Sequence, residues 1–162
     1  QIVTKRISGF EPEVLFFDPM VEKSEFSFAK KCTDLKEIFS TCDIVTIHTP
    51  LMPATKGMVT RELLSMMKKD AILVNAARGG IVDEDALYDI LKEKKIRCAG
   101  FDVFAVEPLP AGHKLMELDN LIMSPHVGAS TEEAQFRVGE MAVHQIREFF
   151  ANNNLLNEVK AK

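Results

Sequence analysis

The chain has 162 residues, of which 46% are hydrophobic and 27% charged, and its formal net charge is -4 at pH 7. These values are ordinary for a globular domain with one hydrophobic core. The acidic balance argues against a nucleic-acid partner, because nucleic-acid-binding surfaces are usually basic. A membrane span needs roughly 20 consecutive apolar residues. The sequence has no such run, and its N-terminal residues lack the charged-then-apolar order of a signal peptide.

The cysteines bear on compartment and metal binding. Cys32, Cys42 and Cys98 are an odd number and have neither metal-ligand nor CxxC spacing. We therefore expect reduced, mostly buried thiols, no bound metal and a cytoplasmic protein.

Short apolar runs alternate with amphipathic stretches along the whole chain. In chain order the patterns predict a strand at residues 14–17, a short strand at 27–31, a helix at 34–40, a strand at 43–48, a helix starting at 60–64, a strand at 71–75, a helix at 83–94, strands at 96–102 and 120–124, and a helix at 130–150. Asp34 is expected near an N-cap, and Asp83 is either an N-cap or a first-turn acid. Continuously apolar strands between helices indicate a parallel sheet covered on both faces. The predicted fold class is α/β, a doubly wound parallel sheet.

Polar or Gly/Pro-rich segments directly follow the predicted strands. In doubly wound sheets, ligands bind outside the carboxyl ends of the strands. The segments in question are Asp18, 48–50, 75–79, 102–107 and 124–128. We expect them to converge on one crevice, which would place Arg78, Glu107 and His126 within reach of one ligand.

These three side chains permit a specific chemistry, although each alone could be an ordinary loop residue. The planar fork of Arg78 can pair bidentately with a carboxylate. His126 can transfer a proton near neutral pH, and a carboxylate such as Glu107 can orient it and stabilise its charged form. The set suits oxidation of an alcohol next to a carboxylate, with a cofactor taking the hydride.

Asp18 and the glycine pair extend this hypothesis to the cofactor and to the loop. An acid at the end of the second strand of a dinucleotide fold accepts hydrogen bonds from the ribose 2′-hydroxyl and favours NAD over NADP. An Asp-Pro turn explains Asp18 as well. Gly79 and Gly80 are expected to let the backbone turn tightly and approach the ligand.

At this point the chain resembles the Rossmann-type NAD-binding domain of the D-2-hydroxyacid dehydrogenase family. The matching blocks, in the family's order and spacing, are VLFFDP (14–19), HTPLMPATKGMV (48–59), LVNAARGGIVDEDAL (73–87), AGFDVFAVEPLP (99–110) and SPHVGASTEEA (124–134). The last block is most similar to the phosphoglycerate dehydrogenase branch.

The resemblance implies roles for individual residues. Arg78 would bind the substrate carboxylate and carbonyl, His126 would be the acid/base, and Glu107 would be its partner. By the same match, the NAD site would be lined by Asp18, Thr49, Pro50, Ala76, Ala77, Arg78, Asp102, His126, Gly128 and Ala129.

One feature departs from the family pattern. The first strand and the glycine-rich GxGxxG loop do not occur in this sequence, and Gln1 stands just past the last glycine of that loop. We therefore expect residues 1–151 to be a fragment of an NAD-binding domain. Residues 152–162 would return toward a substrate-binding domain whose N-terminal part is not in the sequence. The 162 residues alone are expected to bind NAD poorly, because the pyrophosphate-binding loop is missing.

The expected function is hydride transfer between NAD and a D-2-hydroxyacid, with 3-phosphoglycerate and 3-phosphohydroxypyruvate of serine biosynthesis as the first candidate pair. Glycerate/hydroxypyruvate or another small 2-hydroxyacid is an alternative. A different class also stays open, because NAD-sensing transcriptional corepressors of the same fold keep the Arg, Glu and His. The resemblance further implies a homodimer through the NAD-binding domain. The only other expected partner is a small-molecule substrate. We expect neither a nucleic acid nor a membrane as a partner.

Overall fold

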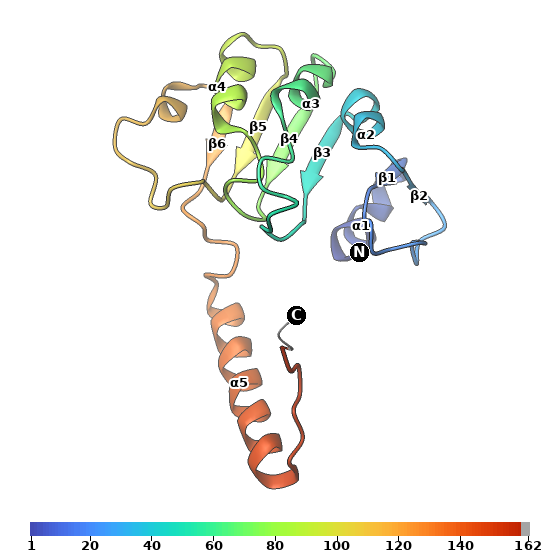
Figure 1. Ribbon diagram of the computed structural model, residues 1–162, viewed down its shortest axis with the longest axis vertical. Helices are drawn as coiled ribbons and strands as arrows, with labels where there is room; N and C mark the ends of the chain where they lie inside the picture. The colour runs from blue at the N-terminus through green and yellow to red at the C-terminus, as the bar shows by residue number, and fades with distance from the viewer. Residues whose placement is uncertain (160–162) are drawn as a thin grey trace. The chain divides into compact units, whose positions relative to one another are not determined.

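The computed structural model describes residues 1–159, which form two compact units (Figure 1). The first unit is Gln1–Pro125 and the second starts at His126, and each is described by itself. The elements in chain order are α1 (Ile2–Ile7), η1 (Ser8–Phe10), β1 (Val14–Phe16), β2 (Ala29–Lys31), α2 (Leu35–Thr41), β3 (Ile44–Ile47), α3 (Arg61–Met66), β4 (Ile72–Asn75), α4 (Glu84–Lys92), β5 (Cys98–Phe101), η2 (Lys114–Glu117), β6 (Leu121–Met123) and α5 (Glu132–Asn152). Every element predicted from the sequence is present. No helix within residues 1–159 is long and apolar enough to cross a membrane.

The strands form two parallel sheets in the first unit. β3, β4, β5 and β6 lie side by side in chain order, and β1 pairs with β2 in a separate two-stranded sheet. The register of the larger sheet aligns Ile44 with Ile72 and Ile72 with Cys98. Since the strands are parallel, their carboxyl ends, and the loops that follow them, share one edge. The predicted parallel α/β class is confirmed.

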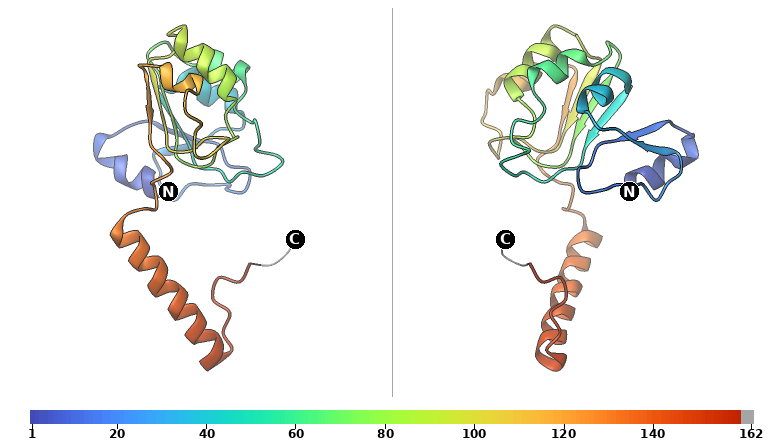
Figure 2. Two further views of the ribbon diagram at one scale, coloured as in Figure 1. Left: turned by 90° about the vertical axis from the view of Figure 1, so that its left-hand side faces the viewer. Right: turned by 45° about the vertical axis from the view of Figure 1, so that its right-hand side comes forward.

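Helices α2, α3 and α4 lie on one face of the four-stranded sheet (Figure 2). Alternate strand residues point to opposite faces, so Leu73 is fully buried while Ile44 and Ile122 are 61% and 74% exposed. Within residues 1–125, helices therefore cover one face of this sheet. The apolar character of the strands had predicted that both faces would be covered. The core lies between this face and the three helices.

Side-chain caps define where the helices begin. Asp34 accepts a hydrogen bond from the Lys36 amide at 2.8 Å, and Asp83 accepts one from the Ala86 amide at 2.9 Å. Such caps typically stabilise a helix by about 0.5–2 kcal/mol. The N-cap prediction is confirmed for both aspartates.

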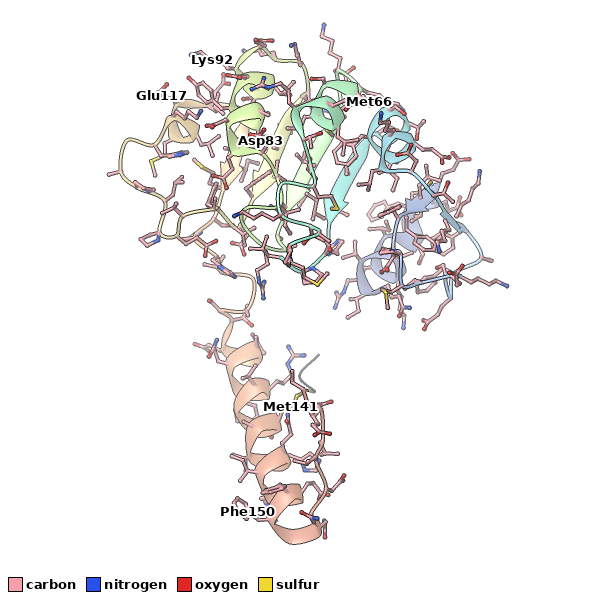
Figure 3. The ribbon with its side chains drawn as sticks, viewed as in Figure 1. Met66, Asp83, Lys92, Glu117, Met141 and Phe150 are labelled. Atoms are coloured by element: carbon pink, nitrogen blue, oxygen red, sulfur yellow. The ribbon has the colours of Figure 1, made fainter. Side chains whose placement is uncertain are left out.

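The second unit contains the long helix α5, which spans 21 residues and has none buried. Thr131 is its N-cap. Apolar side chains including Met141 and Phe150 are exposed along it (Figure 3). The domain boundary expected after residue 151 falls at the end of this helix and stays a prediction. Of the segment expected at 152–162, residues 160–162 lie outside the described residues.

Candidate functional site

The loop after β4 is built on a buried asparagine. Asn75 is 1% exposed. Its Nδ2 donates to the Arg78 carbonyl at 3.1 Å, and its Oδ1 accepts from the Ala77 amide at 3.2 Å. A buried side-chain amide satisfied on both sides shapes the turn 76–78. Asn75 belongs to the segment 75–79 expected at the crevice, but no individual role was predicted for it, although a polar residue at the end of an apolar strand is a signal for one.

Arg78 is exposed at the tip of this turn. Its Nη1 donates to the Ala77 carbonyl at 2.6 Å. A guanidinium has five N–H donors, and this contact uses one of them. The predicted ligand-binding arginine therefore lies on the surface, at the carboxyl edge of the sheet, on a turn that Asn75 holds.

The two glycines after Arg78 serve different purposes. Gly80 has a φ of +74°, a conformation that glycine adopts without strain. At Gly79, a Cβ would lie 1.8 Å from the Phe104 carbonyl oxygen and 2.1 Å from its carbonyl carbon. The loop after β4 thus packs directly against the Phe104 peptide. The tight turn is confirmed at Gly80, while the close approach of Gly79 is to the protein's own backbone.

Glu107 lies on the loop that Gly79 contacts. Its Oε1 accepts from the Phe104 amide at 2.9 Å, which folds the side chain back onto its own turn. The side chains of Val103 and Phe104 are buried and anchor the start of this loop. Arg78 and Glu107 are therefore carried by two loops in direct backbone contact.

The loop after β3, which carries Thr49 and Pro50, lies at the same carboxyl edge of the sheet. The loops after β3, β4 and β5 together are called the rim below. Thr55 is 8% exposed, and its hydroxyl donates to the Pro50 carbonyl at 2.6 Å and accepts from the Met52 amide at 2.8 Å. The Gly57 amide donates to the Gly80 carbonyl at 2.8 Å. Hydrogen bonds and packing thus connect the loops after β3, β4 and β5. The organising role of Thr55 was not predicted from the sequence.

Asp102 ties two strand ends together. Its backbone amide donates to the Asn75 carbonyl at 3.0 Å, and its Oδ1 accepts from the Ser124 hydroxyl at 2.6 Å. Ser124 is also held by its amide, which donates to the Phe101 carbonyl at 3.0 Å. The chain is therefore well anchored shortly before Pro125, the last residue of the first unit.

Asp18 follows β1 and forms a turn. Its Oδ1 accepts from the Met20 amide at 2.8 Å, so the Asp-Pro turn considered for this residue is present. A carboxylate has about four lone-pair sites, and this bond uses one. The role of Asp18 in cofactor binding stays a prediction.

His126 opens the second unit. It has a φ of +54°, a left-handed conformation uncommon outside glycine. The Ser130 amide donates to the Val127 carbonyl at 2.9 Å, which closes a turn containing Gly128 and Ala129. The segment between Pro125 and α5 is therefore an irregular loop. The placement of His126 beside Arg78 and Glu107 stays a prediction.

The contact at Gly79 leads to a stability prediction. Gly79→Ala is expected to destabilise the protein by about 1–3 kcal/mol or more, because the new methyl group overlaps backbone atoms that must shift. Denaturant unfolding of the full-length protein measures this. Gly100→Ala is the control, because a Cβ there meets nothing within 4 Å among the described residues. Equal stability of the two variants would contradict the contact.

The fold and the loops can be compared with known proteins. Residues 1–128 match the family model described as D-isomer specific 2-hydroxyacid dehydrogenase, NAD binding domain. The chain is 45% identical over 149 residues to the D-3-phosphoglycerate dehydrogenase of Methanocaldococcus jannaschii, covering 91% of this chain and 28% of that protein. It is 42% identical over 149 residues to the hydroxypyruvate reductase of Thermotoga maritima, covering 90% of this chain and 48% of that protein.

A solved structure agrees in fold over nearly the whole chain. The D-lactate dehydrogenase with NAD+ from Lactobacillus jensenii matches with a TM-score of 0.87 and 28% identity, covering 99% of this chain and 52% of that one. The chain thus spans about half or less of the length of these three relatives. The matched family model and the identities show that the chain belongs to the D-isomer specific 2-hydroxyacid dehydrogenase family, in its NAD binding domain.

Proposed function

We propose that the protein is an NAD-dependent oxidoreductase that transfers a hydride between NAD and a D-2-hydroxyacid. The observation that carries this proposal is the packing of the Arg78 loop against the Glu107 loop through Gly79. Arg78, which can bind a substrate carboxylate, and Glu107, which can partner a histidine, are thereby held on one rim. This rim is the edge at which doubly wound sheets bind ligands.

The residues at this rim suit a nicotinamide dinucleotide. The carboxylate of Asp18 has lone pairs beyond the one used in its turn, and these can accept hydrogen bonds from ribose hydroxyls. Ala76 and Ala77 have small side chains, so a ligand can come close to the backbone of their loop. We propose that these residues hold the cofactor with Thr49, Pro50, Arg78, Asp102, His126, Gly128 and Ala129. When bound, NAD supplies the hydride acceptor.

Three side chains would carry out the remaining chemistry. Arg78 binds the substrate carboxylate through paired N–H donors and fixes its orientation. His126 takes the proton of the 2-hydroxyl group during oxidation and returns it to the carbonyl oxygen during reduction. Glu107 orients the imidazole and stabilises its protonated form.

For the substrate, we propose the pair 3-phosphoglycerate and 3-phosphohydroxypyruvate, within serine biosynthesis. The 45% identity to a D-3-phosphoglycerate dehydrogenase supports this choice. The second candidate is glycerate/hydroxypyruvate, which the 42% identity to a hydroxypyruvate reductase supports.

A turnover panel on the full-length protein tests the function, with D-3-phosphoglycerate, D-glycerate and D-lactate as donors and NAD or NADP as acceptor. We expect kcat/KM with D-3-phosphoglycerate and NAD to exceed the other combinations by at least about tenfold, because unpaired polar groups penalise an analogue that lacks the phosphate. A preference for D-glycerate would support the second candidate. Lack of turnover on every donor would contradict the proposal and favour a corepressor role.

For the assembly, we propose a cytoplasmic homodimer formed through the NAD-binding domain. The exposed apolar side chains of α5, among them Val138, Met141 and Phe150, support a partner surface, since extended apolar patches mark interaction sites. Light scattering of the full-length protein should give twice the mass of one chain. A monomeric mass at micromolar concentration would contradict the dimer.

A further inference from the structure

Two carboxylates hold successive amides of the loop after β5. The Phe104 amide donates to Glu107 Oε1 at 2.9 Å, and the Ala105 amide donates to Glu84 Oε1 at 2.6 Å. The carbonyl oxygen between these two amides faces Gly79. The peptide that joins Phe104 to Ala105 is thus held through its N–H by Glu84 and backed at its carbonyl by the loop after β4.

Glu84 reaches this loop from a rigid element. It is the first residue of α4 and follows the N-cap Asp83. The Asp83 amide donates to the Val59 carbonyl at 3.0 Å, and the next turn of the helix buries Ala86 and Leu87 in the core. The carboxylate of Glu84 therefore sits on a fixed helix start, while the amide that it binds belongs to an exposed turn.

We infer that Glu84 is a positioning residue for Glu107. By holding the Ala105 amide, it fixes the turn 104–107 in which Glu107 folds back onto Phe104. The inference rests on the proposed function, in which Glu107 orients the acid/base histidine. Glu84 would act only through the loop and contact neither substrate nor cofactor.

The electrostatics of Glu84 indicate that the residue acts as a hydrogen-bond acceptor for the Ala105 amide and that its negative charge is not required. Burial raises the pKa of its carboxyl group, and nearby Asp85 and Glu107 raise it further. The hydrogen bond from Ala105 and the proximity of His113 lower the pKa, yet the net direction is upward. The ionised form is therefore disfavoured here relative to water. A neutral glutamine oxygen should hold the amide as well.

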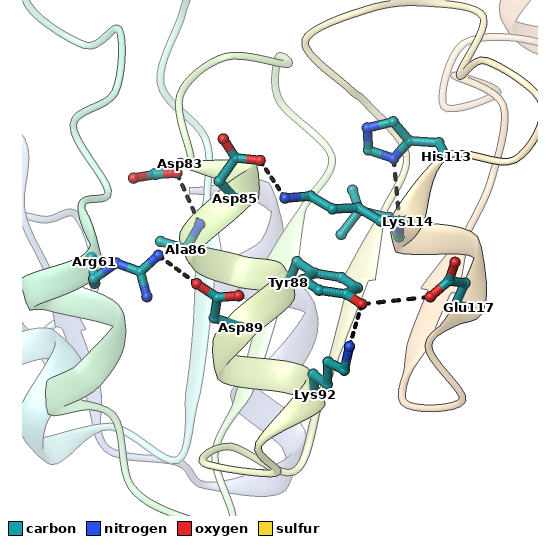
Figure 4. A network of polar contacts seen from close by, with 11 residues as sticks. Arg61, Asp83, Asp85, Ala86, Tyr88, Asp89, Lys92, His113, Lys114 and Glu117 are labelled. Atoms are coloured by element: carbon teal, nitrogen blue, oxygen red, sulfur yellow. Dashed lines mark hydrogen bonds and ion pairs between the residues drawn. The ribbon is translucent and has the colours of Figure 1, made fainter.

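Amide hydrogen exchange on the full-length protein tests the contact without relying on activity. In Glu84→Ala we expect exchange at Phe104 and Ala105 to accelerate about tenfold, as for loss of one hydrogen bond. Glu84→Gln should stay close to wild type. Asp85→Ala is the matched control, because Asp85 lies in the same first turn of α4 but pairs with Lys114 (Figure 4).

Steady-state kinetics on the same variants test the consequence for Glu107. We expect kcat of Glu84→Ala to fall about 10- to 100-fold, since a misplaced group about 1 Å from its position costs up to about 10². KM for NAD should be unchanged, and Glu84→Gln should restore kcat.

Several outcomes would overturn the inference. Unchanged exchange and kcat in Glu84→Ala would do so. Equal losses in Asp85→Ala would also do so, because they would assign the effect to the charge at the helix start. If the wild-type protein turns over no 2-hydroxyacid, the proposed function fails, and the positioning role fails with it. The exchange contrast would then still show whether Glu84 holds the loop.

Discussion

His126→Ala is expected to lower turnover by about two to four orders of magnitude, because the variant loses general acid–base catalysis. NADH binding should be largely retained, since His126 is one of many residues proposed to line the NAD site and its imidazole acts on the substrate proton. Steady-state kcat and a fluorescence titration with NADH on the full-length protein measure the two effects separately.

A second histidine of the same unit provides the control for this variant. His144 is exposed on α5 and has no proposed role. His144→Ala should therefore keep wild-type turnover. Near-normal turnover in His126→Ala would refute its assignment as the acid/base.

Replacement of Arg78 should reveal the geometry of carboxylate binding. Each charge-assisted hydrogen bond is worth about 1.5–3 kcal/mol. We therefore expect kcat/KM to fall about 10²- to 10⁴-fold in Arg78→Ala, where both bonds of a bidentate pair are lost. Arg78→Lys keeps the charge but not the planar fork, and should lose about 10- to 100-fold for one missing bond. Initial-rate kinetics over a range of substrate concentrations measure both values.

The control for the lysine variant is another exposed arginine. Arg61 pairs with Asp89 at 2.6 Å on the outer surface of α3 and α4 (Figure 4). Arg61→Lys should leave kcat/KM unchanged, because an exposed ion pair of this kind contributes little, and only to stability. If Arg78→Lys were equally silent, Arg78 would not bind the carboxylate bidentately.

The helices and strands of this fold could be predicted from local sequence patterns. Residues 71–74 are apolar and are followed by Asn75, and the structure places β4 at Ile72–Asn75. Asp83 was recognised as a helix start because a side-chain oxygen at that position binds an amide two or three residues ahead. Such features depend on neighbours within one or two turns of chain, so the sequence contains them directly.

The exposed residues of the candidate site could be predicted from the sequence, whereas the residues that hold its loops in place could not. Arg78 and Glu107 were identified because their chemistry is distinctive and they lie in the segments that follow two strands. Asn75, Thr55 and Glu84 were missed as organising residues. Their importance lies in which backbone groups they bind, and the chemical type of a side chain does not reveal its partner.

The sequence by itself determined the order of strands and helices, the helix caps and the residues able to carry the proposed chemistry, because each depends on local periodicity or side-chain type. Only the tertiary structure decided that Gly79 meets Phe104, that Glu84 holds Ala105, and that helices of residues 1–125 cover one face of the four-stranded sheet. The contacts of Gly79 and Glu84 join segments more than 20 residues apart. They arise from the parallel register that brings the loops after neighbouring strands to one edge.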